Sequence, residues 1–272
     1  MLEIGIFAKT FKRQSVLEVC QAVRHAGFPQ IQFNMACAGL PSLPDAISPI
    51  HISDIQQALA RTKLSVAGIS GTFNMCHPDP KVRQDGLRRL EVLAQSCHAI
   101  GTHLISLCTG TRDPLDKWTY HPDNPSPAAW RDLCASMERA LDIAERHDLF
   151  LGIEPELANV VDSAAKAKQL LEEMNSHRLT IILDPANLFE KASITEIHRL
   201  IDEAIELLGP HIIMAHAKGK DAHGQFVPPG QGIIPFPYFL NRLLAHDLSP
   251  PLIAHGFSER DVHMVQAYLT TL

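Results

Sequence analysis

Residues 179–221 read LTIILDPANLFEKASITEIHRLIDEAIELLGPHIIMAHAKGKD, and this stretch decides the fold. Its two ends, residues 179–183 and 211–215, are apolar nearly throughout, which is typical of parallel strands covered on both faces. Between them, apolar side chains recur with helical spacing at Ile194, Ile197, Leu200, Ile201, Ala204, Ile205 and Leu208. The stretch therefore predicts a strand, a helix that Ser193 caps, and a second parallel strand.

The same unit repeats along the whole chain. Strand-like runs begin near Leu2, Pro29, Leu64, Thr102, Leu149, Leu179, His211 and Pro251. Their mean spacing is about 36 residues, close to the length of a parallel βαβ unit. Eight such units predict a (β/α)8 TIM barrel, with residues 1–272 forming a single domain. An open, doubly wound sheet is the second alternative, but the first run is followed by Lys9-Thr-Phe-Lys12 and not by the glycine-rich turn of a dinucleotide site.

The composition indicates a globular protein with neither a nucleic-acid nor a membrane partner. Of 272 residues, 46% are hydrophobic and 20% are charged, which excludes a disordered or fibrous chain. The net charge is −6 and the cations are scattered, whereas a nucleic-acid surface needs clustered Lys and Arg. The sequence has no signal peptide, no apolar run of about 18 residues and no C-x-x-C pair among its six cysteines. We therefore expect a cytoplasmic protein with free thiols.

Four of the later runs end on a residue that can bind a metal. Glu154, Asp184, His216 and His255 stand at the carboxyl ends of their runs, and in a TIM barrel these ends form the mouth where active sites lie. Any one of these side chains could instead cap a helix or hold a loop, but four in consecutive units favour one shared site. Two carboxylates with imidazoles suit one divalent ion, of Mn, Co, Zn, Fe or Mg, without selecting among them.

Several segments together carry a family resemblance. They are residues 152–156, 183–188, 216–221 with the 230–232 loop, 70–78 and 108–114. In these motifs the chain resembles the xylose isomerase-like TIM barrels, which include sugar and sugar-phosphate isomerases and epimerases and the endonuclease IV type of nuclease. The resemblance implies metal-ligand roles for Glu154, Asp184 and His216. The family usually has Glu where this chain has His255, and many members have His where it has Asn187.

The resemblance implies a divalent-metal-dependent isomerase or epimerase that moves a proton on a small sugar or sugar phosphate. In the similar epimerases two glutamates on opposite sides of the substrate move this proton, and only Glu154 of the pair is present here. His255 could replace the second glutamate as acid or base, because a neutral imidazole is competent near pH 7, or it could be a ligand alone. Replacing a carboxylate by His255 makes the site less negative, which should strengthen the metal as a Lewis acid. Glu154 and His255 are therefore the predicted catalytic residues.

Polar loops after the third and fourth strands, with two residues of the later strand ends, are expected to hold the substrate. The predicted contacts are Asn74, His77, Arg112, Trp118, His121, Asn187 and Lys218. Together they offer a cationic fork, an apolar platform and hydrogen-bonding groups, which suit a polyol or a sugar phosphate. Trp118 could instead anchor a surface loop, and Lys218 could instead form a salt bridge with Asp184 or Asp221.

Two further side chains near the strand ends have open or structural roles. Glu156, two residues beyond Glu154, is either a loop-tying carboxylate or a second base in the same cleft. Cys108 has no histidine nearby in the sequence to activate it, so buried packing is expected for its thiol.

Two alternative functions stay open at this point. The barrel could have lost catalysis with the last glutamate and only bind a sugar-like ligand or a partner. An endonuclease IV-like phosphodiesterase would need extra His and Asp ligands just before the 230–232 loop, where the chain reads Gln225-Phe-Val-Pro-Pro.

Overall fold

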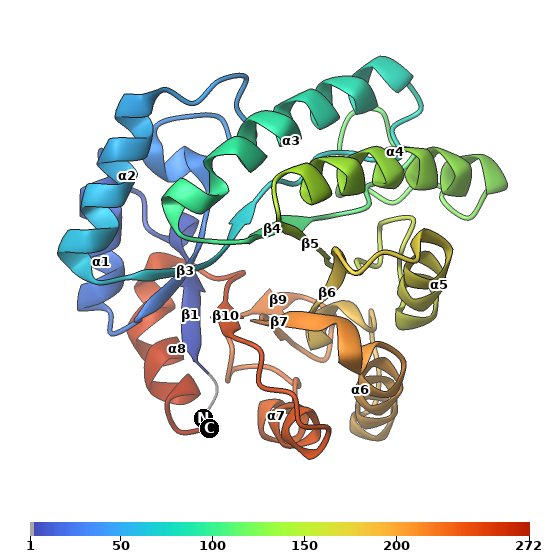
Figure 1. Cartoon of the computed structure of the whole chain (residues 1–272). Coiled ribbons are helices and arrows are strands. Elements are labelled where there is room, and N and C mark those ends of the chain that lie inside the picture. The colour runs from blue at the N-terminus through green and yellow to red at the C-terminus, as the bar shows by residue number, and fades with distance from the viewer. Residues whose placement is uncertain (1–2) are drawn as a thin grey trace.

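The computed structural model describes residues 3–272 and shows a closed barrel of eight parallel strands surrounded by helices (Figure 1). Around the barrel the strands follow the order β1-β10-β7-β6-β5-β4-β3-β2. They are β1 (Ile4–Phe7), β2 (Gln30–Phe33), β3 (Ser65–Ser70), β4 (Leu104–Leu107), β5 (Phe150–Ile153), β6 (Leu179–Leu183), β7 (Ile212–Ala217) and β10 (Leu252–Ala254). The predicted (β/α)8 TIM barrel is confirmed, because each strand begins within two residues of its expected start.

A helix follows every strand of the barrel and packs on its outer face (Figure 1). The helices are α1 (Val16–His25), α2 (Pro49–Thr62), α3 (Pro80–Ile100), α4 (Pro127–Arg146), α5 (Ala164–Met174), α6 (Ile194–Leu208), α7 (Phe236–Ala245) and α8 (Val262–Leu269). Short 3-10 helices are η1 (Ala8–Thr10), η2 (Met35–Ala38), η3 (Pro185–Asn187), η4 (Gly209–His211) and η5 (Glu259–Asp261). Ser193 caps α6 as predicted, since its side chain accepts a hydrogen bond from the Glu196 backbone N–H.

Between β7 and α7 the chain adds a hairpin that the sequence did not predict. Its strands, β8 (Gly219–Lys220) and β9 (Phe226–Val227), pair antiparallel and lie apart from the barrel sheet. The hairpin begins just after the carboxyl end of β7, so it stands at the barrel mouth.

Two groups of apolar side chains stabilise the barrel. The larger group lies between strands and helices, and a smaller one contains Leu104, Ile182, Met214 and Ile253 from β4, β6, β7 and β10. Because side chains alternate across a strand, the smaller group occupies the inside of the barrel. A Cβ at Gly152 would touch both Ile182 and Leu104, which shows how tightly this interior is filled. This packed interior supports the mouth from below.

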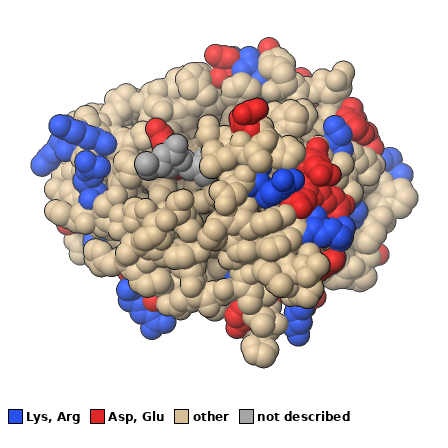
Figure 2. All heavy atoms as spheres, turned by 90° about the horizontal axis from the view of Figure 1, so that it is seen from below, with Lys and Arg blue, Asp and Glu red and all other residues tan. Residues whose placement is uncertain are grey.

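The surface carries mixed charge. Figure 2 shows one face, on which Lys and Arg form small groups separated by neutral surface and interspersed with Asp and Glu. Among residues 3–272, none of the helices has the length and apolar composition that crossing a membrane requires.

Truncating the barrel interior should destabilise the protein. Leu104 is 4% exposed, so Leu104→Ala should lower the free energy of unfolding by about 2–5 kcal/mol. Leu115 is 94% exposed, and the matched change Leu115→Ala should alter it by less than about 0.5 kcal/mol. Urea denaturation of both variants measures the difference. Equal effects would contradict the assignment of Leu104 to the core.

Candidate metal and active site

The structure brings Glu154, Asp184, His216 and His255 together at the mouth of the barrel. Glu154 follows β5, Asp184 follows β6, His216 lies near the end of β7 and His255 follows β10. One ligand atom from each side chain lies within 4.8 Å of the others. This compares with about 4.4 Å between two donors on opposite sides of one small cation. The four strand ends therefore form a single polar cluster.

Asp184 has two roles, one for each carboxylate oxygen. Its Oδ1 accepts a hydrogen bond from the Ala186 backbone N–H at 2.9 Å, which caps η3. Its Oδ2 faces the cluster, 3.2 Å from His255 Nε2 and 3.4 Å from Lys218 Nζ. Burial alone would raise the pKa of Asp184, but the charge of Lys218 and the contact with His255 hold that pKa well below its ordinary value. Asp184 is therefore a buried carboxylate, with one oxygen fixed and one directed at the site.

His216 presents one ring nitrogen to the cluster and uses the other for support. Its Nε2 donates to Oε1 of Gln32 at 2.8 Å, and the Gln32 amide N–H donates to Ser106 Oγ at 2.9 Å. With the proton on Nε2, Nδ1 carries a lone pair. Nδ1 is buried without a hydrogen-bond partner and faces the Oε1 of Glu154 at 3.2 Å. Two acceptors in this position repel each other unless a metal ion binds both or a proton joins them.

These residues fit a divalent metal ion. The unpartnered Nδ1 of His216, Oε1 of Glu154, Oδ2 of Asp184 and Nε2 of His255 provide a mixed nitrogen and oxygen set. Such a set binds first-row divalent ions and magnesium with different preferences but excludes none of them by ligand type. Burial lowers the pKa of His255, which favours the neutral imidazole that a metal requires.

Asn187 connects the ligands to a lysine. Its amide N–H donates to Glu154 Oε1 at 2.9 Å, and its Oδ1 accepts from Lys218 Nζ at 2.7 Å. Lys218 also forms an ion pair with Asp184, which was the alternative to its predicted substrate contact. Burial would lower the pKa of Lys218, but the negative charges of Asp184 and Glu154 raise it, so the ammonium stays charged. Asn187 and Lys218 thus support the ligand cluster while they line the space above it.

A cavity of about 510 Å³ opens above the cluster, a size that suits a small-molecule ligand. Of the predicted substrate contacts, Trp118, Asn187 and Lys218 line this cavity. Glu156 also lines it, together with Glu154. Burial and the negative charge of Glu154 raise the pKa of Glu156 to about 8, so this carboxyl holds a proton at neutral pH. The cavity wall therefore carries one ionised and one protonated carboxyl group.

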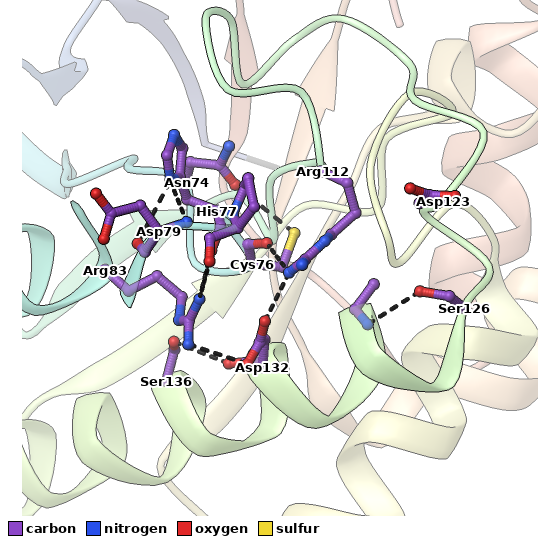
Figure 3. Close-up of polar contacts among 12 residues, drawn as sticks. Asn74, Cys76, His77, Asp79, Arg83, Arg112, Asp123, Ser126, Asp132 and Ser136 are labelled. Atoms are coloured by element: carbon purple, nitrogen blue, oxygen red, sulfur yellow. Dashed lines mark hydrogen bonds and ion pairs between the residues drawn. The ribbon is translucent and has the colours of Figure 1, made fainter. Parts of the chain in front are cut away.

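Asn74, His77, Arg112 and His121 do not line this cavity but contact the surrounding loops. Figure 3 shows the first three of them. Asn74 Oδ1 accepts from the Thr111 backbone N–H at 3.0 Å, and the ring nitrogens of His77 contact the Asp79 and Pro114 backbone. Arg112 donates to the Cys76 carbonyl at 2.8 Å and to Asp132 of α4 at 2.6 Å. His121 accepts from the Asp123 backbone N–H at 3.2 Å.

Further contacts in this network attach the loop that contains Arg112 to neighbouring helices. Arg83 of α3 donates to the second oxygen of Asp132 at 2.9 Å, so the loop is attached to two helices (Figure 3).

Cys108 is buried, and burial raises the pKa of its thiol, as expected for a packing residue. The predicted substrate-binding roles of the four loop residues stay predictions.

Sequence reasoning missed Gln32 and Lys220, and it left Glu156 open. All three line the cavity. Gln32 belongs to β2, whose residues are all buried, so a polar side chain in that strand was the available signal. Lys220 follows His216 by four residues, but only the unpredicted hairpin places it at the mouth.

Comparisons with known proteins agree with this architecture. The sequence profile of the xylose isomerase-like TIM barrel family matches residues 20–268, and no curated protein matches the chain by sequence. An E. coli 3-keto-D-glucoside 4-epimerase structure is similar with a TM-score of 0.80 and 17% identity, covering 100% of both chains. D-psicose 3-epimerase from Clostridium cellulolyticum, solved with D-tagatose, gives 0.77 and 16%, covering 99% of this chain and 98% of that one.

A third similar structure was solved with a metal. It is a xylose isomerase-like TIM barrel protein from Mycobacterium smegmatis in complex with magnesium, with a TM-score of 0.68 and 15% identity, covering 94% of this chain and 87% of that one. At these identities the structural likeness shows the fold.

Gln32 should raise the metal affinity of the site, because it accepts the hydrogen bond that holds the His216 ring. Gln32→Leu removes the acceptor of the Nε2 proton and should weaken metal binding about 10–100-fold, whereas Gln32→Glu keeps an acceptor and should bind at least as well as the wild type. Isothermal titration with manganese or zinc measures both. Unchanged affinity in Gln32→Leu would show that the His216 ring is held by other contacts.

Proposed function

The chain belongs to the xylose isomerase-like TIM barrel family, and we propose that it is a divalent-metal-dependent isomerase or epimerase of a small sugar or sugar phosphate. One observation carries this proposal. The buried, unpartnered Nδ1 of His216 faces Glu154 within a four-residue cluster at the base of the cavity. With a neutral His216, a cluster of this kind leaves two buried acceptors in repulsion unless a metal ion binds both. The epimerase neighbours support the reaction class by analogy of fold.

Glu154, Asp184, His216 and His255 would hold the metal ion in this proposal. When bound, such an ion supplies Lewis-acid polarisation of the carbonyl and hydroxyl oxygens of a sugar. Polarisation of this kind acidifies the hydrogen on the adjacent carbon, which a positioned base can then remove.

The residues that move the proton would be found on the cavity wall. Glu154 lines the cavity and accepts the Asn187 hydrogen bond on Oε1, which leaves Oε2 free of that bond to act as a base. Glu156 lines the same cavity and can return a proton. His255 serves as the fourth ligand, or as the second acid or base when its Nε2 is free of metal.

Trp118 and Lys218 would contact the substrate. Trp118 is half exposed at the cavity rim, where its ring can cover the apolar face of a sugar. Lys218 lines the cavity and holds Asn187 and Asp184, so its ammonium can also meet a developing oxyanion.

Proton transfer in D2O should incorporate deuterium into the product. The protein is loaded in turn with Mn, Co, Zn, Fe or Mg and incubated in D2O with a panel of ketopentoses, ketohexoses and their phosphates. Nuclear magnetic resonance should show an isomer or epimer with deuterium at the reacting carbon, because the proton passes through an exchangeable side chain. Asp184→Asn should lower turnover by more than about 100-fold. Glu206→Gln, on the exposed face of α6, is the matched control.

Three other outcomes would contradict the proposal, and each favours a different alternative. Binding of these sugars without turnover across the panel would favour the ligand-binding alternative. Cleavage of abasic DNA would favour the nuclease. Turnover that survives in Asp184→Asn would place the chemistry elsewhere.

Glu156 should contribute to catalysis without holding the metal. Glu156→Gln removes the transferable proton while it keeps the shape of the side chain, so kcat should fall about 100–10,000-fold. Metal content should match the wild type, because Glu156 is outside the ligand cluster. Steady-state kinetics on metal-quantified protein tests this expectation. A wild-type kcat in Glu156→Gln would assign the residue to loop structure.

A further inference from the structure

Lys220 is a buried ammonium whose charge has no carboxylate partner among residues 3–272. It is 2% exposed, lines the cavity, and donates one hydrogen bond to the Phe189 carbonyl. None of the ion pairs in the described part of the chain includes it. An ammonium has three donors, and a buried charge that lacks a counter-ion is costly. Two of the three donors therefore remain available.

Aromatic rings cover this lysine and its neighbour. Lys220 Nζ lies 5.0 Å from the centre of the Phe189 ring and 5.3 Å from that of Phe226. Phe226 also lies 4.3 Å from Lys218 Nζ, lines the cavity and is 55% exposed. Rings attract ammonium groups through their faces but donate no charge. They hold the lysines in place without neutralising them.

The hairpin fixes the backbone of Lys220. Lys220 pairs with Phe226 across β8 and β9, and its carbonyl accepts a hydrogen bond from the Ile233 N–H at 2.8 Å. A side chain at Gly232 would collide with that same carbonyl, so the 230–233 loop approaches closely only because residue 232 is glycine. The lysine is thus positioned before any ligand arrives, which reduces the entropy lost on binding.

The charge balance of the cavity leaves a positive excess. Four lysines line it, against the two glutamates Glu154 and Glu156; the lysines are Lys9, Lys117, Lys218 and Lys220. A divalent ion in the cluster would offset the charges of Glu154 and Asp184. Lys218 forms an ion pair with Asp184 and a hydrogen bond with Asn187. Lys220 forms no ion pair with a carboxylate among the described residues. A neutral sugar would leave this excess charge unmatched.

We propose that Lys220 selects a substrate that carries an anionic group, a phosphate or a carboxylate, and binds that group at the hairpin side of the cavity. The inference rests on the proposed function for the reaction, and it narrows the substrate class from sugars in general to anionic ones. Burial and the charge of Lys218 lower the pKa of Lys220, and a bound anion would favour its charged form again.

The test compares anionic and neutral probes on the same protein. Manganese-loaded wild type, Lys220→Met, Lys220→Arg and the control Lys191→Met are titrated with D-fructose, D-fructose 6-phosphate and D-gluconate. The wild type should bind the phosphate or the carboxylate at least about 10-fold more tightly than fructose, the scale of a charge-assisted hydrogen bond. Lys220→Met should lose this preference while its affinity for fructose changes less than about 2-fold. Lys220→Arg should keep much of it, and Lys191→Met, on an exposed loop, should keep all of it.

The two anionic probes distinguish the sources of the anion, and circular dichroism of each variant reports on folding. Equal binding of all three probes by the wild type, binding of neither anion, or an anion preference that survives in Lys220→Met would overturn the inference. The proposed function has a separate readout. Turnover of neutral sugars without anion preference would leave that function intact, whereas anion preference in a protein without turnover would leave only the binding inference.

Discussion

The burial of two carboxylates, Glu154 and Asp184, in the barrel mouth is the constraint on which the rest of the site depends. Each buried carboxylate costs several kcal/mol unless cations or hydrogen-bond donors surround it. The chain supplies these from different elements: Lys218 follows β7, and Asn187 belongs to η3. Nδ1 of His216 still faces Oε1 of Glu154, and a divalent ion would bind at this position.

The sequence allowed the barrel and the four ligand candidates to be predicted for a common physical reason. Parallel strands covered on both faces are nearly uniform apolar runs, so a polar residue at their carboxyl ends, such as Asp184 after β6, is visible without a structure. The polar loop residues could not be assigned in the same way. Arg112 could have entered the cavity or held its loop, and the choice depends on Asp132, which is twenty residues away on α4. Lys220 was missed because a two-residue strand has no periodic signal.

His255 and the lysines that line the cavity both make the site less negative. With His255 as the fourth member, the four candidate ligands carry two negative charges, which a divalent ion would balance. Any further lysine then adds positive charge that the ligands do not cancel, and Lys220 is the one that lies buried without an acid. The replacement of a carboxylate by His255 and the proposed selection of an anionic substrate therefore both follow from a less negative site.

Metal stoichiometry tests this account most directly. Plasma mass spectrometry is performed on gently purified wild type, on His216→Ala and on His211→Ala, which alters a histidine at the opposite end of β7. The account predicts about one divalent ion per chain in the wild type and in His211→Ala, and its loss in His216→Ala. A wild type that holds no metal and takes up none of Mn, Co, Zn, Fe or Mg would contradict the account, as would full metal content in His216→Ala.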